Sequence, residues 1–308
     1  MTFEMKLKGP FSLAETNQYF GGWASYGPTQ PTITMAFPVE GWHSSAAVRL
    51  RQSEDVISGE VVVANDQAES AWNQALAVLS LNVDAQDWPK IGEIDPVIGK
   101  LQAKYQFLRP VLFHSPYEAA ASFIIGHRLT MQQGRIIRQS MAEAYGDNVQ
   151  VADTHLFAFP RPQVLLSINA VKGITPEKID RLHGIARAAL DGRLDRSKLL
   201  SMPIDQALTQ LRALDGIGPF FSQGILFRGA GIVDELTNDD VTKQAVQTAY
   251  GLSCEPDQLA IQQIAEAWRP YRMWAEVLLH VWLRREAGGP RRQSKARNQR
   301  KPAAPPMN

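Results

Sequence analysis

The sequence predicts an α+β protein, in which a small antiparallel sheet with a helix is followed by an all-α domain. Strand-like segments rich in β-branched residues gather between Pro31 and Asn65, whereas no convincing strand pattern is found after Trp88. From there, helical patterns follow one another to about Arg285. With 308 residues, of which 44% are hydrophobic, the chain is long enough to form two domains.

The first domain is predicted over residues 1–87. Its strands are the segments TITMAFP, AAVRLRQ and VISGEVVV, which turn-forming residues separate. A helix is predicted from about Gln67 to Leu81, because the apolar residues there recur at three- and four-residue spacing. Together these elements make a compact α+β unit.

The second domain is predicted over residues 88–286 and consists of helices. Four prolines stand where a first helical turn can begin. N–H groups in the first turn have no acceptor within the helix, so proline, which lacks an N–H, is tolerated there. They are Pro116, Pro176, Pro203 and Pro219. The last segment, 287–308, is rich in Pro, Gly, Arg and Lys without an acid, and is predicted to be a disordered basic tail. This tail can attract nucleic acid or serve only for solubility.

Charge and cysteine content narrow the classes of protein. The formal net charge is +1, but the six basic residues of the tail leave the remainder mildly acidic, so a phosphate-binding surface has to be a local patch. The single cysteine, Cys254, excludes an intramolecular disulfide, a four-thiolate zinc site and an iron-sulfur cluster. No long apolar run or secretory signal is found, so we expect a cytoplasmic protein without membrane contact, nucleoid-associated if bacterial.

Two glycines interrupt the helical pattern in the stretch LRALDGIGPFFSQ. A helix from about Pro203 to Leu214 precedes them, and Pro219 starts the next helix. Gly216 and Gly218 can both adopt positive φ and leave the backbone uncovered, so that N–H groups at the new helix start could bind a phosphate oxygen. A tight helix-helix turn without a ligand is the other interpretation.

An acidic pair follows this hinge. Asp240 lies 24 residues after Gly216, and Asp239 stands directly before it. Asn238 or Asp239 is well placed to cap the next helix, but capping does not require both acids. Lys243, close by in sequence, is expected to be an ordinary solvated lysine.

The stretch LDGIGPFFSQGILFRGAG, followed by TNDDVTKQA, resembles the helix-hairpin-helix base-excision DNA glycosylases, and within them the AlkA-like 3-methyladenine DNA glycosylase II branch. SPYEAAASFIIGHRLTMQQGRIIRQSMAEAYGD looks like the opening helix pair of the family, and AWRPYRMWAEVLLHVWL like its closing helix. The resemblance covers about Phe107 to Arg285 and extends more loosely to the N-terminal α+β domain.

The resemblance implies a monofunctional DNA glycosylase of base excision repair, which flips an alkylated purine out of double-stranded DNA and hydrolyses its N-glycosidic bond. Asp240 aligns with the family's catalytic aspartate, and Asp239 takes a supporting role. The implied phosphate-binding hairpin, 214–219, contains Leu214, Gly216, Ile217 and Gly218. A monomer without cofactor is expected, and the family allows a monovalent cation at the hairpin carbonyls.

The base pocket is expected to contain aromatic residues, because an alkylated purine is cationic. Phe220 stands where strand-cutting relatives have a nucleophilic lysine, which implies hydrolysis without strand cleavage. Trp274 and Trp282 are candidate pocket walls, although aromatics at helical spacing also suit a core. His280 aligns with the pocket tryptophan of the branch.

The family's wedge, which fills the gap left by the flipped base, falls in the sequence GHRLTM. Arg128 or Leu129 would be the wedge, and His127 replaces the usual glutamine. A non-catalytic DNA-binding or damage-sensing protein remains an alternative, as does a glycosylase with another lesion range. A bifunctional glycosylase-lyase is disfavoured by Phe220.

Overall fold

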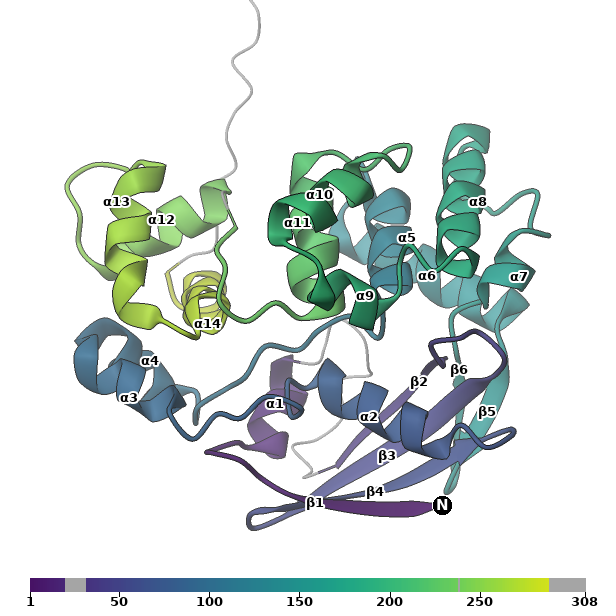
Figure 1. The fold of residues 1–308 in the computed structure, drawn as a ribbon, viewed down its shortest axis with the longest axis horizontal. Helices are drawn as coiled ribbons and strands as arrows, with labels where there is room; N and C mark the ends of the chain where they lie inside the picture. Colours follow the sequence, from purple (N-terminus) through teal and green to yellow (C-terminus); the bar gives the residue numbers. More distant parts are fainter. Residues whose placement is uncertain (20–31, 238, 288–308) are drawn as a thin grey trace, which may run out of the picture.

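The computed structural model describes residues 1–19, 32–237 and 239–287, so almost all of the predicted basic tail and Asn238 lie outside the described residues. Figure 1 shows a twisted sheet on one side of the molecule and two groups of helices on the other. The strands are β1 Thr2–Lys6, β2 Thr32–Pro38, β3 Ser45–Ser53, β4 Val56–Val63, β5 Asn148–Val151 and β6 Thr154–Phe157.

The helices divide into those before and those after the hairpin. The earlier ones are α1 Leu13–Tyr19, α2 Ala68–Val78, α3 Trp88–Ile94, α4 Pro96–Lys104, α5 Pro116–Gly126, α6 Met131–Tyr145, α7 Pro162–Leu165, α8 Pro176–Leu190, α9 Arg196–Ser201 and α10 Ile204–Arg212. The later ones are α11 Pro219–Gly224, the π-helical turn η2 Ile225–Ala230, α12 Asp240–Ala249, α13 Gln258–Ala265, the 3₁₀ turn η3 Glu266–Trp268 and α14 Arg272–Arg285.

The main sheet is antiparallel with strand order β1-β4-β3-β2. The three predicted strands are confirmed, two of them with the predicted bounds, and α2 falls within the predicted helix. The edge strand β1 was not predicted, because TFEMK is short and carries two charged residues. Only its pairing with β4 defines it as a strand.

The expectation of an all-α region after Trp88 is wrong at one place. β5 and β6 form a two-stranded antiparallel ladder, with Val151 opposite Thr154. Each strand has only four residues, and most of those side chains are exposed or half-buried, so the sequence lacks a recognisable strand pattern.

Prolines define several helix starts, as predicted. Pro116, Pro176 and Pro219 are the first residues of α5, α8 and α11, and Pro203 is the N-cap of α10. The N-cap side chains of Ser115 and Thr175 accept hydrogen bonds from backbone N–H groups in the first turns of α5 and α8. Proline and the capping hydroxyls therefore set these helix starts through contacts within the first turn.

Three hydrophobic clusters hold these elements together. The sheet core joins the inner faces of β2–β4 to α2. The hairpin core joins α5, α8, α10 and η2. The closing core joins α3 and α4 to α12–α14, which come from the other end of the helical region. Helices far apart in sequence thus pack into one unit (Figure 1).

Arg109 lies where the sheet core and the closing core meet. Its side chain is 1% exposed and donates hydrogen bonds to backbone carbonyls, including Lys8 O at 2.7 Å and Ser80 O at 3.3 Å. The guanidinium also lies 5.5 Å from the ring centroids of Phe11 and Trp274. Burial lowers the pKa of Arg109 to about 10. Carbonyl dipoles and ring faces compensate the buried charge.

We predict that Arg109→Met lowers the free energy of unfolding by about 2–4 kcal/mol, because the carbonyls lose their donor and stay buried. Urea denaturation followed by circular dichroism measures this loss. Arg51→Met, at an exposed position on β3, is the matched control and leaves the midpoint nearly unchanged. Equal midpoints for the two variants would contradict a structural role of Arg109.

Candidate active site

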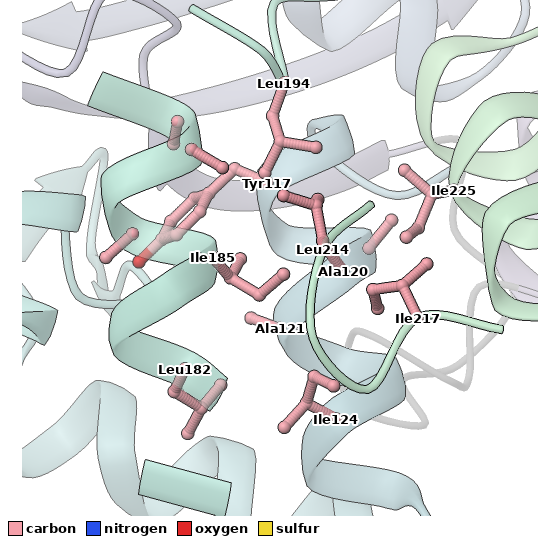
Figure 2. Close-up of a cluster of buried hydrophobic side chains, with 14 of the residues drawn as sticks. Tyr117, Ala120, Ala121, Ile124, Leu182, Ile185, Leu194, Leu214, Ile217 and Ile225 are labelled. Atoms are coloured by element: carbon pink, nitrogen blue, oxygen red, sulfur yellow. The ribbon is translucent and has the colours of Figure 1, made fainter. Parts of the chain in front are cut away.

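The predicted hairpin connects α10 to α11, and apolar side chains anchor it. Leu214 and Ile217 are 6% and 4% exposed and belong to the hairpin core. Figure 2 shows both side chains pointing from the loop into the cluster that contains Ile124 and Ile225. The loop backbone is therefore held over the end of α5, and the side chains leave its outer face uncovered.

The two glycines of the hairpin differ in conformation. Gly216 has φ +78°, and a Cβ there would lie 2.8 Å from Cδ of Arg181 and 2.9 Å from Cδ1 of Ile124. Gly218 is extended, with φ −86° and ψ −174°, so the expectation of positive φ at both glycines is wrong for Gly218. A Cβ on Gly218 would meet no atom within 4 Å. Gly216 is thus required by the fold, whereas Gly218 leaves space for an approaching group.

The structure gives the two adjacent acids different surroundings. Asp239 is the N-cap of α12, and its Oδ1 accepts a hydrogen bond from the Thr242 backbone N–H at 2.7 Å. Asp240 is the first helical residue, with a side chain that is 55% exposed and 3.6 Å from Nζ of Lys243. The cap occupies Asp239, while Asp240 presents its carboxylate to solvent at a helix end that favours negative charge.

A buried polar network connects α14 to the residues around the start of α12. Glu276 of α14 is 2% exposed and accepts hydrogen bonds from the hydroxyls of Thr237 and Thr242, both at 2.5 Å. His280, one turn further along α14, lies 2.9 Å from Oγ1 of Thr242 through Nε2. Burial raises the pKa of Glu276 to about 7 and lowers that of His280 to about 4.

Sequence reasoning missed Glu276, Thr237 and Thr242. The available signal was an acid within the apolar run MWAEVLLHVW, since a carboxylate on a buried helix face requires partners. Its partners lie 39 and 34 residues away, so they could not be named from local pattern.

Phe220 is the exposed aromatic residue next to the hairpin. Its ring is 55% exposed and lies edge-on to Phe123, with centroids 6.4 Å apart. Phe221, beside it, stacks on Phe123 at 5.0 Å. The cluster fixes the base of the Phe220 ring while its outer surface stays open for stacking.

The two tryptophans predicted as pocket walls both belong to the closing core or pack against it. Trp274 is fully buried in the closing core and packs edge-on against Trp88 at 5.6 Å, so it is a core residue and has no exposed face. Trp282 is half-buried against the same core. His280 is bonded to Thr242 and does not present an unengaged ring.

The predicted wedge forms the turn between α5 and α6. Arg128 is exposed and has φ +60°, a left-handed conformation that is costly for a residue with a Cβ. Leu129 is half-buried, and the ring of His127 lies edge-on to Phe221 at 5.9 Å. Lys178 Nζ donates to the carbonyls of Ile125 and His127, both at 2.8 Å, and so holds the turn in place.

A cavity of about 1300 Å³ lies between β2, α5, α6 and β6. His127, Arg128 and Leu129 contribute to its lining, but Asp240 and Phe220 do not. In the described part of the chain, no group of three or more His, Cys, Asp or Glu residues could hold a metal ion. Nor is any described helix long and apolar enough to cross a membrane.

The chain is similar to known proteins in both sequence and fold. No family model matches the chain. A DNA-3-methyladenine glycosylase of Bacillus subtilis (strain 168) is 22% identical over 204 residues, or 65% of this chain and 67% of that protein. A second relative from that organism matches over 60% of its own length, also at 22% identity.

Solved structures resemble the fold over most of the chain. A 3-methyladenine DNA-glycosylase from Archaeoglobus fulgidus has a TM-score of 0.75 at 18% identity, covering 92% of this chain and 98% of that one. A Clostridium acetobutylicum 8-oxoguanine glycosylase/lyase, in complex with double-stranded DNA, has a TM-score of 0.60 at 16% identity, covering 78% and 84%. The chain therefore has the fold of these DNA glycosylases.

We predict that Gly216→Ala lowers the free energy of unfolding by about 1–2 kcal/mol, because a Cβ is unfavourable at this left-handed φ. Its contacts with Arg181 and Ile124 add to this cost. Gly218→Ala is the matched control and leaves stability unchanged, since its Cβ enters open space. Urea titration measures the free energy of unfolding of both variants. Equal decreases in this free energy would refute the different roles given to the two glycines.

Proposed function

We propose that this protein is a monofunctional DNA glycosylase of base excision repair, which hydrolyses the N-glycosidic bond of flipped-out alkylated purines such as 3-methyladenine. The proposal rests above all on Asp240, whose exposed carboxylate stands beside a neighbour that already caps the helix. The names of the sequence relative and of the archaeal structure support the lesion class.

In this proposal, Asp240 acts at the sugar of the flipped nucleotide. Departure of the base develops positive charge on the deoxyribose, and a fixed carboxylate stabilises that charge and orients water for attack. Asp239 holds the helix start and leaves its neighbour for chemistry. The protein's contribution is therefore charge stabilisation at a preset position.

The hairpin and the wedge turn would hold the DNA. Gly218 has no side chain to obstruct a phosphate, and the first N–H groups of α11 have no acceptor within the helix. Arg128 is the exposed member of the wedge turn and Leu129 the half-buried one, so we assign Arg128 to the gap left by the base. A monomer needs no cofactor for this reaction, and a monovalent cation at the hairpin carbonyls would bring the phosphate closer.

The position of Phe220 supports hydrolysis without strand cleavage. Cleavage by β-elimination requires an amine that forms a Schiff base with C1′, and phenylalanine has none. The nearby amine of Lys243 lies 3.6 Å from Oδ1 of Asp240 and forms an ion pair with it. The exposed Phe220 ring offers a face for a cationic purine.

A non-catalytic damage-binding protein is the second candidate. One observation favours it: Trp274 is buried and His280 is bonded within the network, so Phe220 alone of the proposed aromatic walls is largely exposed. Release of methylated base by the wild-type protein would exclude this candidate.

We predict that Asp240→Asn slows release of 3-methyladenine from methylated duplex DNA by about 100-fold or more, because the neutral amide cannot offset the charge on the sugar. Asp239→Asn is a matched control, since asparagine caps a helix as well as aspartate does, and it retains a rate within about tenfold of the wild type. Single-turnover assays with both variants measure the difference. The opposite ranking would make Asp239 the catalytic residue.

We also predict no covalent adduct between the wild-type protein and abasic-site or lesion DNA after borohydride reduction, because residue 220 carries no amine. Phe220→Lys introduces the amine and serves as the test of geometry. An adduct formed by the wild type, detected by denaturing gel electrophoresis and lost in Lys243→Met, would instead assign lyase activity to Lys243.

A further inference from the structure

We propose that Glu276 is a positioning residue: it fixes the N-terminal turn of α12 and, through that turn, the direction in which Asp240 presents its carboxylate. This inference rests on the proposed function. Glu276 lies on α14 and does not itself line the exposed surface.

The contacts of Glu276 converge on the segment directly before the acidic pair. The Thr237 N–H lies 3.2 Å from both carboxylate oxygens, and the Thr237 hydroxyl lies 2.5 Å from Oε1. The Thr242 hydroxyl approaches the same oxygen at 2.5 Å. One buried carboxylate thus binds both sides of the turn that contains Asp240.

The same two threonines also bind Asp239. The Thr242 N–H donates to Oδ1 of Asp239 at 2.7 Å, and the Thr237 hydroxyl lies 3.2 Å from its Oδ2. The single proton of the Thr237 hydroxyl is shared between Glu276 and Asp239, whereas Thr242 binds Asp239 through its N–H and Glu276 through its hydroxyl, so the four residues form one ring of polar contacts. Asp240 lies between two members of the ring in sequence, so its backbone has little freedom to rotate.

The hydrogen bonds of this network can form with glutamine in place of Glu276. With Glu276 ionised, both threonine hydroxyls donate to it, and His280 completes the network as the Nε2–H tautomer that donates to Thr242. With Glu276 protonated, its O–H donates to the Thr242 hydroxyl, and that hydroxyl donates in turn to Nε2 of His280 in the Nδ1–H tautomer. Glutamine supplies an acceptor and a donor of the same shape, so the ring requires hydrogen-bonding capacity rather than negative charge.

The experiment compares Glu276→Gln, Glu276→Leu and Thr237→Val with Leu279→Ala, a destabilising control at a buried position on the same helix. Single-turnover base release from methylated duplex DNA is measured together with affinity for an abasic-site duplex. We expect Glu276→Leu to lose about 100-fold in rate with affinity within about threefold, because Asp240 is misplaced. Glu276→Gln keeps a rate within about threefold of the wild type, and Thr237→Val falls between them.

Hydrogen exchange measured by mass spectrometry on peptides covering 234–246 gives an independent readout. Glu276→Leu accelerates exchange in this segment, whereas Leu279→Ala does not do so selectively. The inference is overturned if Glu276→Leu and Leu279→Ala have equal rates and equal exchange. Absence of base release by the wild type would refute the proposed function instead, and the exchange comparison would still decide whether Glu276 orders the turn.

Discussion

The buried Glu276 carboxylate is the interaction on which the candidate active site depends most. It connects α14 to the start of α12 through Thr237 and Thr242, and the same threonines bind the helix cap. A carboxylate removed from water is costly unless several donors compensate it, and here three donors come from one turn. The stability of that turn and the position of Asp240 are consequences of the same bonds.

The opposite face of α14 gives the N-terminal region a part in the site. Trp274 packs against Trp88 and covers Arg109, whose guanidinium binds carbonyls of the segment that follows β1. The Arg109 guanidinium thus contacts both the segment after β1 and Trp274 of α14, the helix that binds the start of α12 through Glu276.

The sequence predicts those elements whose residue pattern and flanking turns lie within a few residues of one another. The strands Thr32–Pro38 and Val56–Val63 were predicted with their observed bounds, because β-branched residues and flanking turns mark both ends. The edge strand Thr2–Lys6 was missed, since pairing alone defines it. Trp274 and Glu276 lie on one helix, yet which of them faces a core and which a polar partner depends on residues far away in sequence.

In the proposed reaction, the two successive aspartates have separate tasks. The capping carboxylate of Asp239 accepts the Thr242 N–H at 2.7 Å, and such a bond disperses charge that would otherwise stabilise a cation. The residue after the cap also lies in the favourable field of the helix start. Asp240 occupies that position as the first residue of α12, with its side chain 55% exposed. A cationic alkylated base is already a good leaving group, so a fixed negative charge and a stacking face are the two elements its release requires.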